Sequence, residues 1–182
     1  MKPKYREDKA TQVAAKFLEL RGGRMHYLKL IKLLYLADRE ALIRWRRPIT
    51  YDTYVAMSYG PVVSQTFDVL QGNILLDGIW KKHISPPMGD YEVQIKRAPG
   101  TSSLSKAEEE LIAEIFDQYG HMNSFKLCDI THNFPEWNDP KGSSTPISYK
   151  DILSGADMTD IEVQSIIDEI EQIALMDEHF ER

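Results

Sequence analysis

Three residues on one segment have the types and the spacing of metal ligands. Cys128 and His132 are four residues apart, which places them on one face of a helix, and Glu136 follows after the same interval. These side chains can all bind zinc, but a zinc site needs a fourth ligand or a water. The segment around Cys128 is apolar, where a cysteine is normally a small, unreactive hydrophobic residue. We therefore expect His132 to cap its helix, and we expect no metal and no cofactor.

Asp38 is a carboxylate on the apolar side of a predicted helix. Its neighbours around the helix are Ile31, Leu34, Leu42 and Trp45. A buried carboxylate without donors or a cation would cost several kcal/mol. One interpretation, which we favour, is a carboxylate that accepts backbone N–H groups from a neighbouring loop. The other is a general acid or base with a raised pKa.

The opposite side of the same helix carries a polar arc with a basic end. Its members are Lys29, Lys32, Arg39, Glu40, Arg44, Arg46 and Arg47. Guanidinium groups recognise carboxylates and phosphates, and Trp and Arg often dominate the energetics of protein interfaces. We therefore predict that Arg39, Arg44, Arg46 and Arg47 bind a partner. The alternative is that Trp45 belongs to the core and the arginines offset the helix dipole at its C-terminus.

Signatures of the common enzyme classes are missing from the chain. The sequence contains no Gly-rich phosphate loop, no GxGxxG, no HExxH and no GxSxG. Nothing in the sequence argues for catalysis, and we expect a protein that is not an enzyme.

Apolar residues at helical spacing predict the elements that position these side chains. The predicted helices cover residues 8–20, 26–46, 105–120, 124–131 and 159–176. The helix over 26–46 is apolar around most of its circumference, so it should lie at the centre of the core. Reciprocal capping patterns start two of the others, at Ser105–Glu108 and at Thr159–Glu162.

Shorter stretches predict a small sheet among the helices. Residues 54–58, 79–84 and 91–97 have the composition or the alternation of strands. Gly60 and Pro61 read as a turn with Pro61 at the first position of a further helix, and residues 140–146 read as a surface loop. The predicted fold is therefore α+β and mainly α-helical, with a small antiparallel sheet beside the central helix.

Length and charge bound the organisation of the chain. Its 182 residues suit one domain, the single cysteine excludes an internal disulfide, and the charged N-terminus and short apolar runs predict a cytoplasmic protein without a membrane span. Residues 1–50 carry 13 Lys+Arg and 5 Asp+Glu, a charge of +8, and the remainder carries −14, which gives the overall −6. We favour two halves that attract each other over a nucleic-acid-binding face.

Four segments in this order resemble the Panacea domain, also called the SocA-like antitoxin domain. They are residues 32–38 (KLLYLAD), 56–63 (AMSYGPVV), 131–132 (TH) and 135–137 (PEW), with Pro48 between the first two. The resemblance covers about residues 10–137. Residues 138–182 would then add a loop and an acidic C-terminal helix packed on this core.

The resemblance implies an antitoxin that neutralises a cognate toxin by direct protein contact, with a protease complex as a further partner in some members. The shared motif would be scaffold: Asp38, Tyr59, Gly60, Pro61, His132 and Trp137. We expect Asp38 to accept N–H groups from the turn at 59–61. A nucleic-acid-binding regulator that uses the basic N-terminal helices is the alternative function, and a homodimer through the last helix is left open.

Overall fold

The computed structural model describes residues 2–74 and 76–180. Its helices are α1 (Glu7–Arg21), α2 (Tyr27–Trp45), α3 (Ser64–Gln71), α4 (Ile79–His83), α5 (Lys106–Tyr119), α6 (Ser124–His132), α7 (Tyr149–Gly155) and α8 (Asp160–Phe180). Its strands are β1 (Arg24–His26), β2 (Tyr54–Met57), β3 (Gly60–Val63), β4 (Glu92–Gln94) and β5 (Thr145–Ile147). The predicted mainly helical α+β fold is confirmed.

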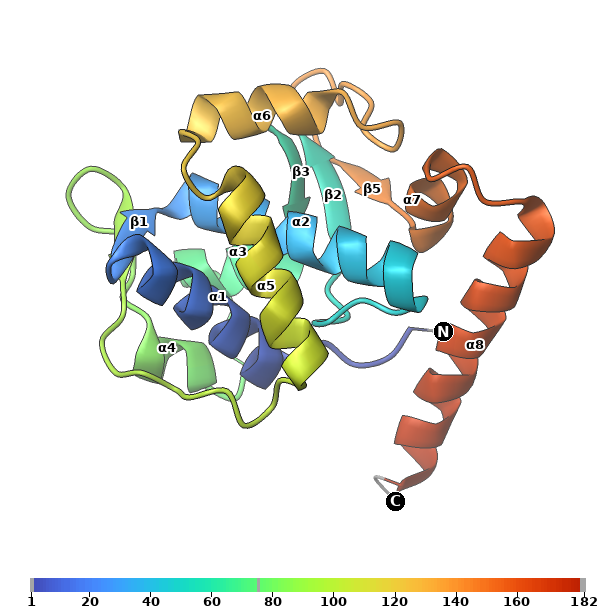
Figure 1. Ribbon diagram of the computed structural model, residues 1–182, viewed down its shortest axis with the longest axis horizontal. Coiled ribbons are helices and arrows are strands. Elements are labelled where there is room, and N and C mark those ends of the chain that lie inside the picture. Colours follow the sequence, from blue (N-terminus) through green and yellow to red (C-terminus); the bar gives the residue numbers. More distant parts are fainter. Residues whose placement is uncertain (1, 75, 181–182) are drawn as a thin grey trace.

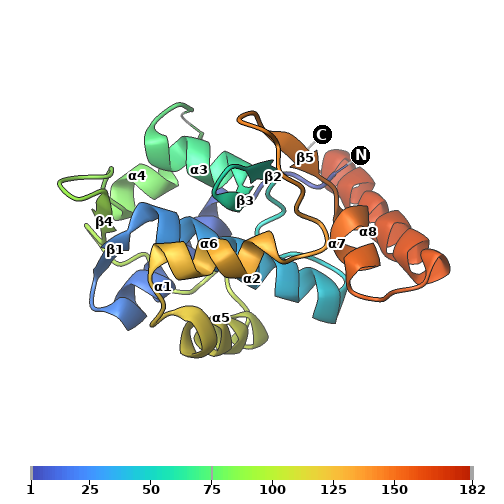
Figure 2. The same cartoon turned by 90° about the horizontal axis from the view of Figure 1, so that it is seen from above.

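Helix α2 lies at the centre of the molecule, as its apolar circumference predicts. It packs against α1, α5, α6, α7 and β3 (Figures 1 and 2). Leu30, Ile31, Leu33 and Leu42 of this helix are completely buried. A helix surrounded on all sides must present apolar residues on all sides, which explains the sequence pattern.

The strands form two small antiparallel sheets instead of one. Strands β3, β2 and β5 make a three-stranded sheet in that order, with Tyr54 opposite Val63 on one side and opposite Ile147 on the other. Strand β4, within the predicted strand 91–97, pairs with β1 as a separate two-stranded sheet. Pro61 lies in β3 and not at the start of a helix, which the sheet tolerates because β3 is an edge strand.

The strand predicted over 79–84 is wrong, because these residues form helix α4. The carboxylate of Glu7, on α1, accepts the backbone N–H groups of Asp77 at 2.9 Å and Trp80 at 3.0 Å. Trp80 is buried in the core. The helical turn therefore depends on a cap supplied from more than 70 residues away, which local sequence patterns do not reveal.

The C-terminal part of the chain contains more helices and strands than the predicted loop and single helix. The predicted loop at 140–146 contains the start of β5, and helix α7 follows directly after β5. Helix α8 packs against α7 and buries Val163, Ile166, Ile170 and Ala174. Both predicted capping boxes, at Ser105–Glu108 and Thr159–Glu162, are present. Among the described residues, no helix has the length and apolarity that a bilayer span requires.

The opposite charges of the two parts of the sequence meet within the fold. Among the described residues, six ion pairs join residues 1–50 to the rest of the chain: Lys9–Glu108, Lys16–Glu109, Arg24–Glu92, Arg39–Glu136, Arg44–Glu114 and Arg46–Glu169. The favoured interpretation of the charge asymmetry, attraction between the two parts of one molecule, is therefore confirmed.

Candidate functional site

Lys32 joins the central helix to the β2–β3 hairpin. Its Nζ donates a hydrogen bond to the carbonyl of Pro61 at 2.7 Å. The side chain is completely buried, although the polar arc predicted an exposed position. Burial lowers the pKa of Lys32 to about 7, because the charged form loses its hydration.

Gly60 sits where three segments converge. Its φ is +99°, and a Cβ at this position would lie 2.7 Å from both Lys32 Nζ and Thr131 Oγ1. Positive φ favours glycine, and the lack of a side chain leaves room for the lysine and the threonine. The tight approach of hairpin, α2 and α6 therefore requires glycine here.

The rings of His132 and Trp137 stack with their centroids 4.1 Å apart. The indole Nε1 of Trp137 donates to the carbonyl of Met57 at 3.1 Å, which holds the segment after α6 against β2. His132 is the last residue of α6, but its buried Nε2 has no hydrogen-bond partner among the described residues. Stacking on Trp137 therefore replaces the capping contact that we expected.

Asp38 is a buried carboxylate satisfied by donors, but by different donors from those expected. It accepts hydrogen bonds from the backbone N–H groups of Ile49 and Thr50, each at 3.0 Å. The hydroxyls of Thr50 and Tyr54 also donate to it. The predicted partner, the turn at 59–61, is wrong: that turn is held by Lys32. Burial raises the pKa of Asp38 to about 7, against the effect of the donated hydrogen bonds.

Arg39 points into the protein and forms a buried ion pair with Glu136. Its Nε lies 2.6 Å from a Glu136 oxygen that also accepts the hydroxyl of Tyr35 at 2.8 Å. The Arg39 guanidinium also stacks over the ring of Phe134 at 4.1 Å. Glu136 therefore pairs with a cation and not with Cys128 and His132. Nowhere in the described part of the chain do three His, Cys, Asp or Glu residues cluster as a metal site would require.

The other predicted partner-binding residues lie at the C-terminal end of α2, on the surface. Arg44 contacts Glu40 at 2.6 Å and Glu114 at 2.7 Å, and Arg46 lies 3.4 Å from Glu169. A hollow of about 500 Å³ at this end is lined by Trp45, Arg46, Arg47, Ser105, Ala107, Glu108, Glu169 and Ile173. It combines aromatic, aliphatic and guanidinium groups at one exposed place.

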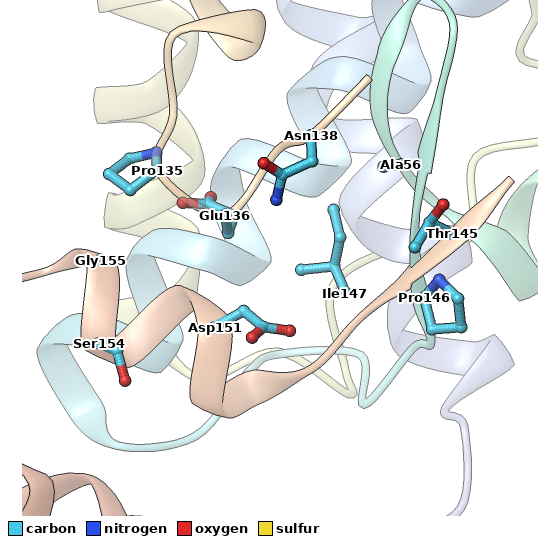
Figure 3. Close-up of a pocket in the computed structure, with 10 residues that line it drawn as sticks. All are labelled: Ala56, Pro135, Glu136, Asn138, Thr145, Pro146, Ile147, Asp151, Ser154 and Gly155. Carbon is cyan, nitrogen blue, oxygen red and sulfur yellow. The ribbon is translucent and has the colours of Figure 1, made fainter. Parts of the chain in front are cut away.

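A second hollow, a cleft of about 530 Å³, lies beside the scaffold (Figure 3). Its walls come from residues 135–138, from β5 and from α7. Figure 3 shows Asn138 and Asp151 directing their polar groups toward the space between these walls, with Ile147 between them. Both carboxylates that line the cleft already have partners. Glu136 pairs with Arg39, and Asp151 accepts a hydrogen bond from Ser148 in the cap of α7. The cleft therefore has both polar and apolar side chains on its walls.

These features define a helical α+β domain in which most motif residues contact other elements of the fold, whereas Tyr59 is 63% exposed and Arg44, Arg46 and Arg47 lie on the surface. Residues 30–138, more than half of the chain, match the family model for the SocA-like antitoxin, Panacea domain. The chain belongs to this family. No curated protein and no solved structure matches it.

Proposed function

We propose that this protein neutralises a toxin by direct protein–protein contact, without covalent chemistry of its own. Membership in an antitoxin-like family supports a protein partner and a non-catalytic role. The observation that carries the proposal is that the buried charged groups of the motif segments form hydrogen bonds within the fold. Asp38, Lys32 and Glu136 are all buried and hydrogen-bonded, which suits a scaffold and leaves recognition to the surface.

The surface that we assign to the toxin is the hollow at the end of α2. Trp45 and Ile173 supply apolar area, and Arg46 and Arg47 supply guanidinium groups around it. Interfaces commonly combine an apolar centre with a polar rim. Arg44 precedes Trp45 in the sequence, whereas Arg39 is held in its buried pair with Glu136 and lies outside the lining of this hollow.

A toxin fits this surface better than a nucleic acid does. Lys9, Lys16, Arg44 and Arg46 each contact a carboxylate of the same chain. A nucleic-acid-binding face would need these cations for phosphates, and its binding would fall steeply as salt is raised. Toxin binding around an apolar centre should lose much less affinity when NaCl is raised from about 50 to about 300 mM.

Co-expression with the gene next to the one that encodes this protein tests the proposal, because the resemblance to antitoxins implies a toxin gene beside the antitoxin gene. That gene is expressed alone and together with this one, and growth is compared. We expect growth inhibition by the neighbour and rescue by co-expression with the wild-type chain. A shorter toxin half-life during rescue would add delivery to a protease, and an unchanged half-life would limit the mechanism to binding.

Charge reversal at the hollow tests the surface. Arg44→Glu, Arg46→Glu and Arg47→Glu are combined, with Arg39 left intact because it holds Glu136. The matched control reverses Lys81, Lys82 and Lys126, which are exposed on α4 and α6. Loss of rescue with the arginine triple alone supports the surface. Rescue by both triple variants would mean that the toxin binds at another surface. Absence of rescue by the wild-type chain would contradict the proposed function.

A further inference from the structure

Helix α8 has an inner face that attaches it to the molecule. Val163, Ile166, Ile170 and Ala174 are buried, and at about 100° per residue they fall within one narrow arc. Figures 1 and 2 show the helix along one side of the molecule, beyond α7. Half of its circumference therefore faces away from the core.

The outer face of α8 carries exposed apolar residues toward both of its ends, with the polar residues Gln164, Asp168 and Gln172 between them. Ile161 is 84% exposed, Leu175 52% and Met176 59%, and all three lie on the side opposite the buried stripe. Hollows of about 570 Å³ and 530 Å³ lie along this face and share Gln172. The face is thus a continuous shallow strip from Asp160 to His179.

Acidic residues lie both beside this strip and within it. Helix α8 contains seven carboxylates and no lysine or arginine. The carboxylates belong to Asp160, Glu162, Asp168, Glu169, Glu171, Asp177 and Glu178. Charged residues beside apolar contacts are the means by which paired helices select their partners.

We infer that the outer face of α8 docks a basic amphipathic helix of the toxin. Apolar residues of the toxin helix would contact Ile161, Leu175 and Met176, and its lysines or arginines would pair with the acidic residues of α8. A second copy of α8 would bring carboxylates against carboxylates, and like charges at such an interface are unfavourable. This charge pattern selects a basic partner over a homodimer. The inference rests on the proposed function and names the chemistry of the segment that the toxin contributes.

The position of α8 in the chain agrees with a role in selecting one partner. Residues 160–180 lie outside the segment 30–138 that matches the family. The hollow at the end of α2 includes Glu169 and Ile173 of the same helix, so the two surfaces adjoin. A toxin that contacts the arginines can therefore also reach α8.

The test uses the full chain and the purified product of the adjacent gene. The α8 variant combines Asp168→Lys, Leu175→Ser, Met176→Ser and Glu178→Lys, all outside the buried stripe. The control makes the same kinds of change on α6, Phe125→Ser with Asp129→Lys, where Phe125 is 74% exposed. Titration calorimetry gives Kd, and circular dichroism verifies that each variant keeps its helix content and its thermal transition.

We expect the α8 variant to bind about 100-fold more weakly than the wild-type chain, as loss of central interface residues commonly produces. The α6 control should bind within about 3-fold of wild type by the same measure. Reversing basic residues of the toxin to glutamate should restore part of the affinity for the α8 variant. Equal toxin affinity of the wild-type chain and the α8 variant would overturn the inference. The proposed function would still stand if co-expression rescues growth. The inference would also be overturned if the wild-type chain forms a dimer and the α8 variant is a monomer.

Discussion

Lys32 shows how one buried cation ties stability to pH. The side chain is completely buried, and its Nζ donates a hydrogen bond to the backbone carbonyl of Pro61. Its pKa is about 7 in the folded protein and near 10.4 in an unfolded chain. Between these values the unfolded chain binds the extra proton, so the folded state gains stability as pH rises.

We therefore predict that the unfolding free energy rises between about pH 7 and pH 9.5, by up to about 1.4 kcal/mol per pH unit. Lys32→Met should flatten this slope because it removes the titrating group. Lys81→Met, at an exposed position, should leave the slope as it is. Urea unfolding at several pH values measures all three. An equally steep slope in Lys32→Met would refute the assignment.

Gly60 allows a sharp test of the three-way contact. Gly60→Ala adds a Cβ against Lys32 Nζ and Thr131 Oγ1 at a φ of +99°. Gly142 also has a positive φ, of +83°, but a Cβ there would meet nothing within 4 Å. We expect Gly142→Ala to cost about 1–2 kcal/mol for the backbone alone. Gly60→Ala should cost about 1–3 kcal/mol more, from overpacking. Equal losses in chemical denaturation would show that the contact is not tight.

At the scale of elements, α4 depends on a cap from α1. Glu7→Gln should weaken this cap, because a neutral amide accepts the N–H groups of Asp77 and Trp80 less strongly than a carboxylate does. We expect a loss of about 1–2 kcal/mol and faster hydrogen exchange of α4 amides. The control is Asp8→Asn. Asp8 is an acidic residue in the same first turn of α1, but its carboxylate contacts Arg6. Exchange in α4 should stay unchanged in that control.

Periodicity predicted the elements that bury one continuous stripe. The helices that became α1, α2, α5, α6 and α8 were found with small errors at their ends, because their apolar spacing repeats over several turns. Among the elements of three to seven residues, β2 and β4 were predicted as strands, β1, β5 and α7 were missed, and β3 and α4 were assigned to the wrong type of structure. Strand β5 exists because Ile147 pairs with Tyr54, more than 90 residues earlier, and such pairing leaves no local pattern.

The candidate site was predicted in outline and not in its contacts. The helical wheel correctly gave Asp38 a buried direction, but a wheel does not say which loop lies opposite. The chain reverses after α2 through positive φ values at Arg46 and Tyr51, which brings the N–H groups of Ile49 and Thr50 to the carboxylate. The wheel also grouped Lys32 and Arg39 with solvent-facing cations, whereas the packing of the hairpin and of residues 131–137 covers both.

At the scale of the whole molecule, attraction between the basic N-terminal part and the acidic remainder contributes to stability. Arg44 and Arg46 both contact glutamates distant in sequence, and salt screens exposed pairs of this kind. We expect Arg44→Gln with Arg46→Gln to destabilise the protein at low ionic strength, and the difference from wild type to shrink as NaCl is raised. Thermal unfolding across a salt series measures it. Lys81→Gln with Lys82→Gln, outside these pairs, should show no such convergence.

The one-sided attachment of α8 makes this helix a practical starting point for redesign. Four small or aliphatic side chains anchor it, and its outward positions take no part in that packing. A library varied at 161, 164, 168, 172 and 175 could be screened for altered toxin preference without disturbing the hydrophobic interior. Under the proposed function, substitutions on this one exposed helix face could then change which toxin the protein binds.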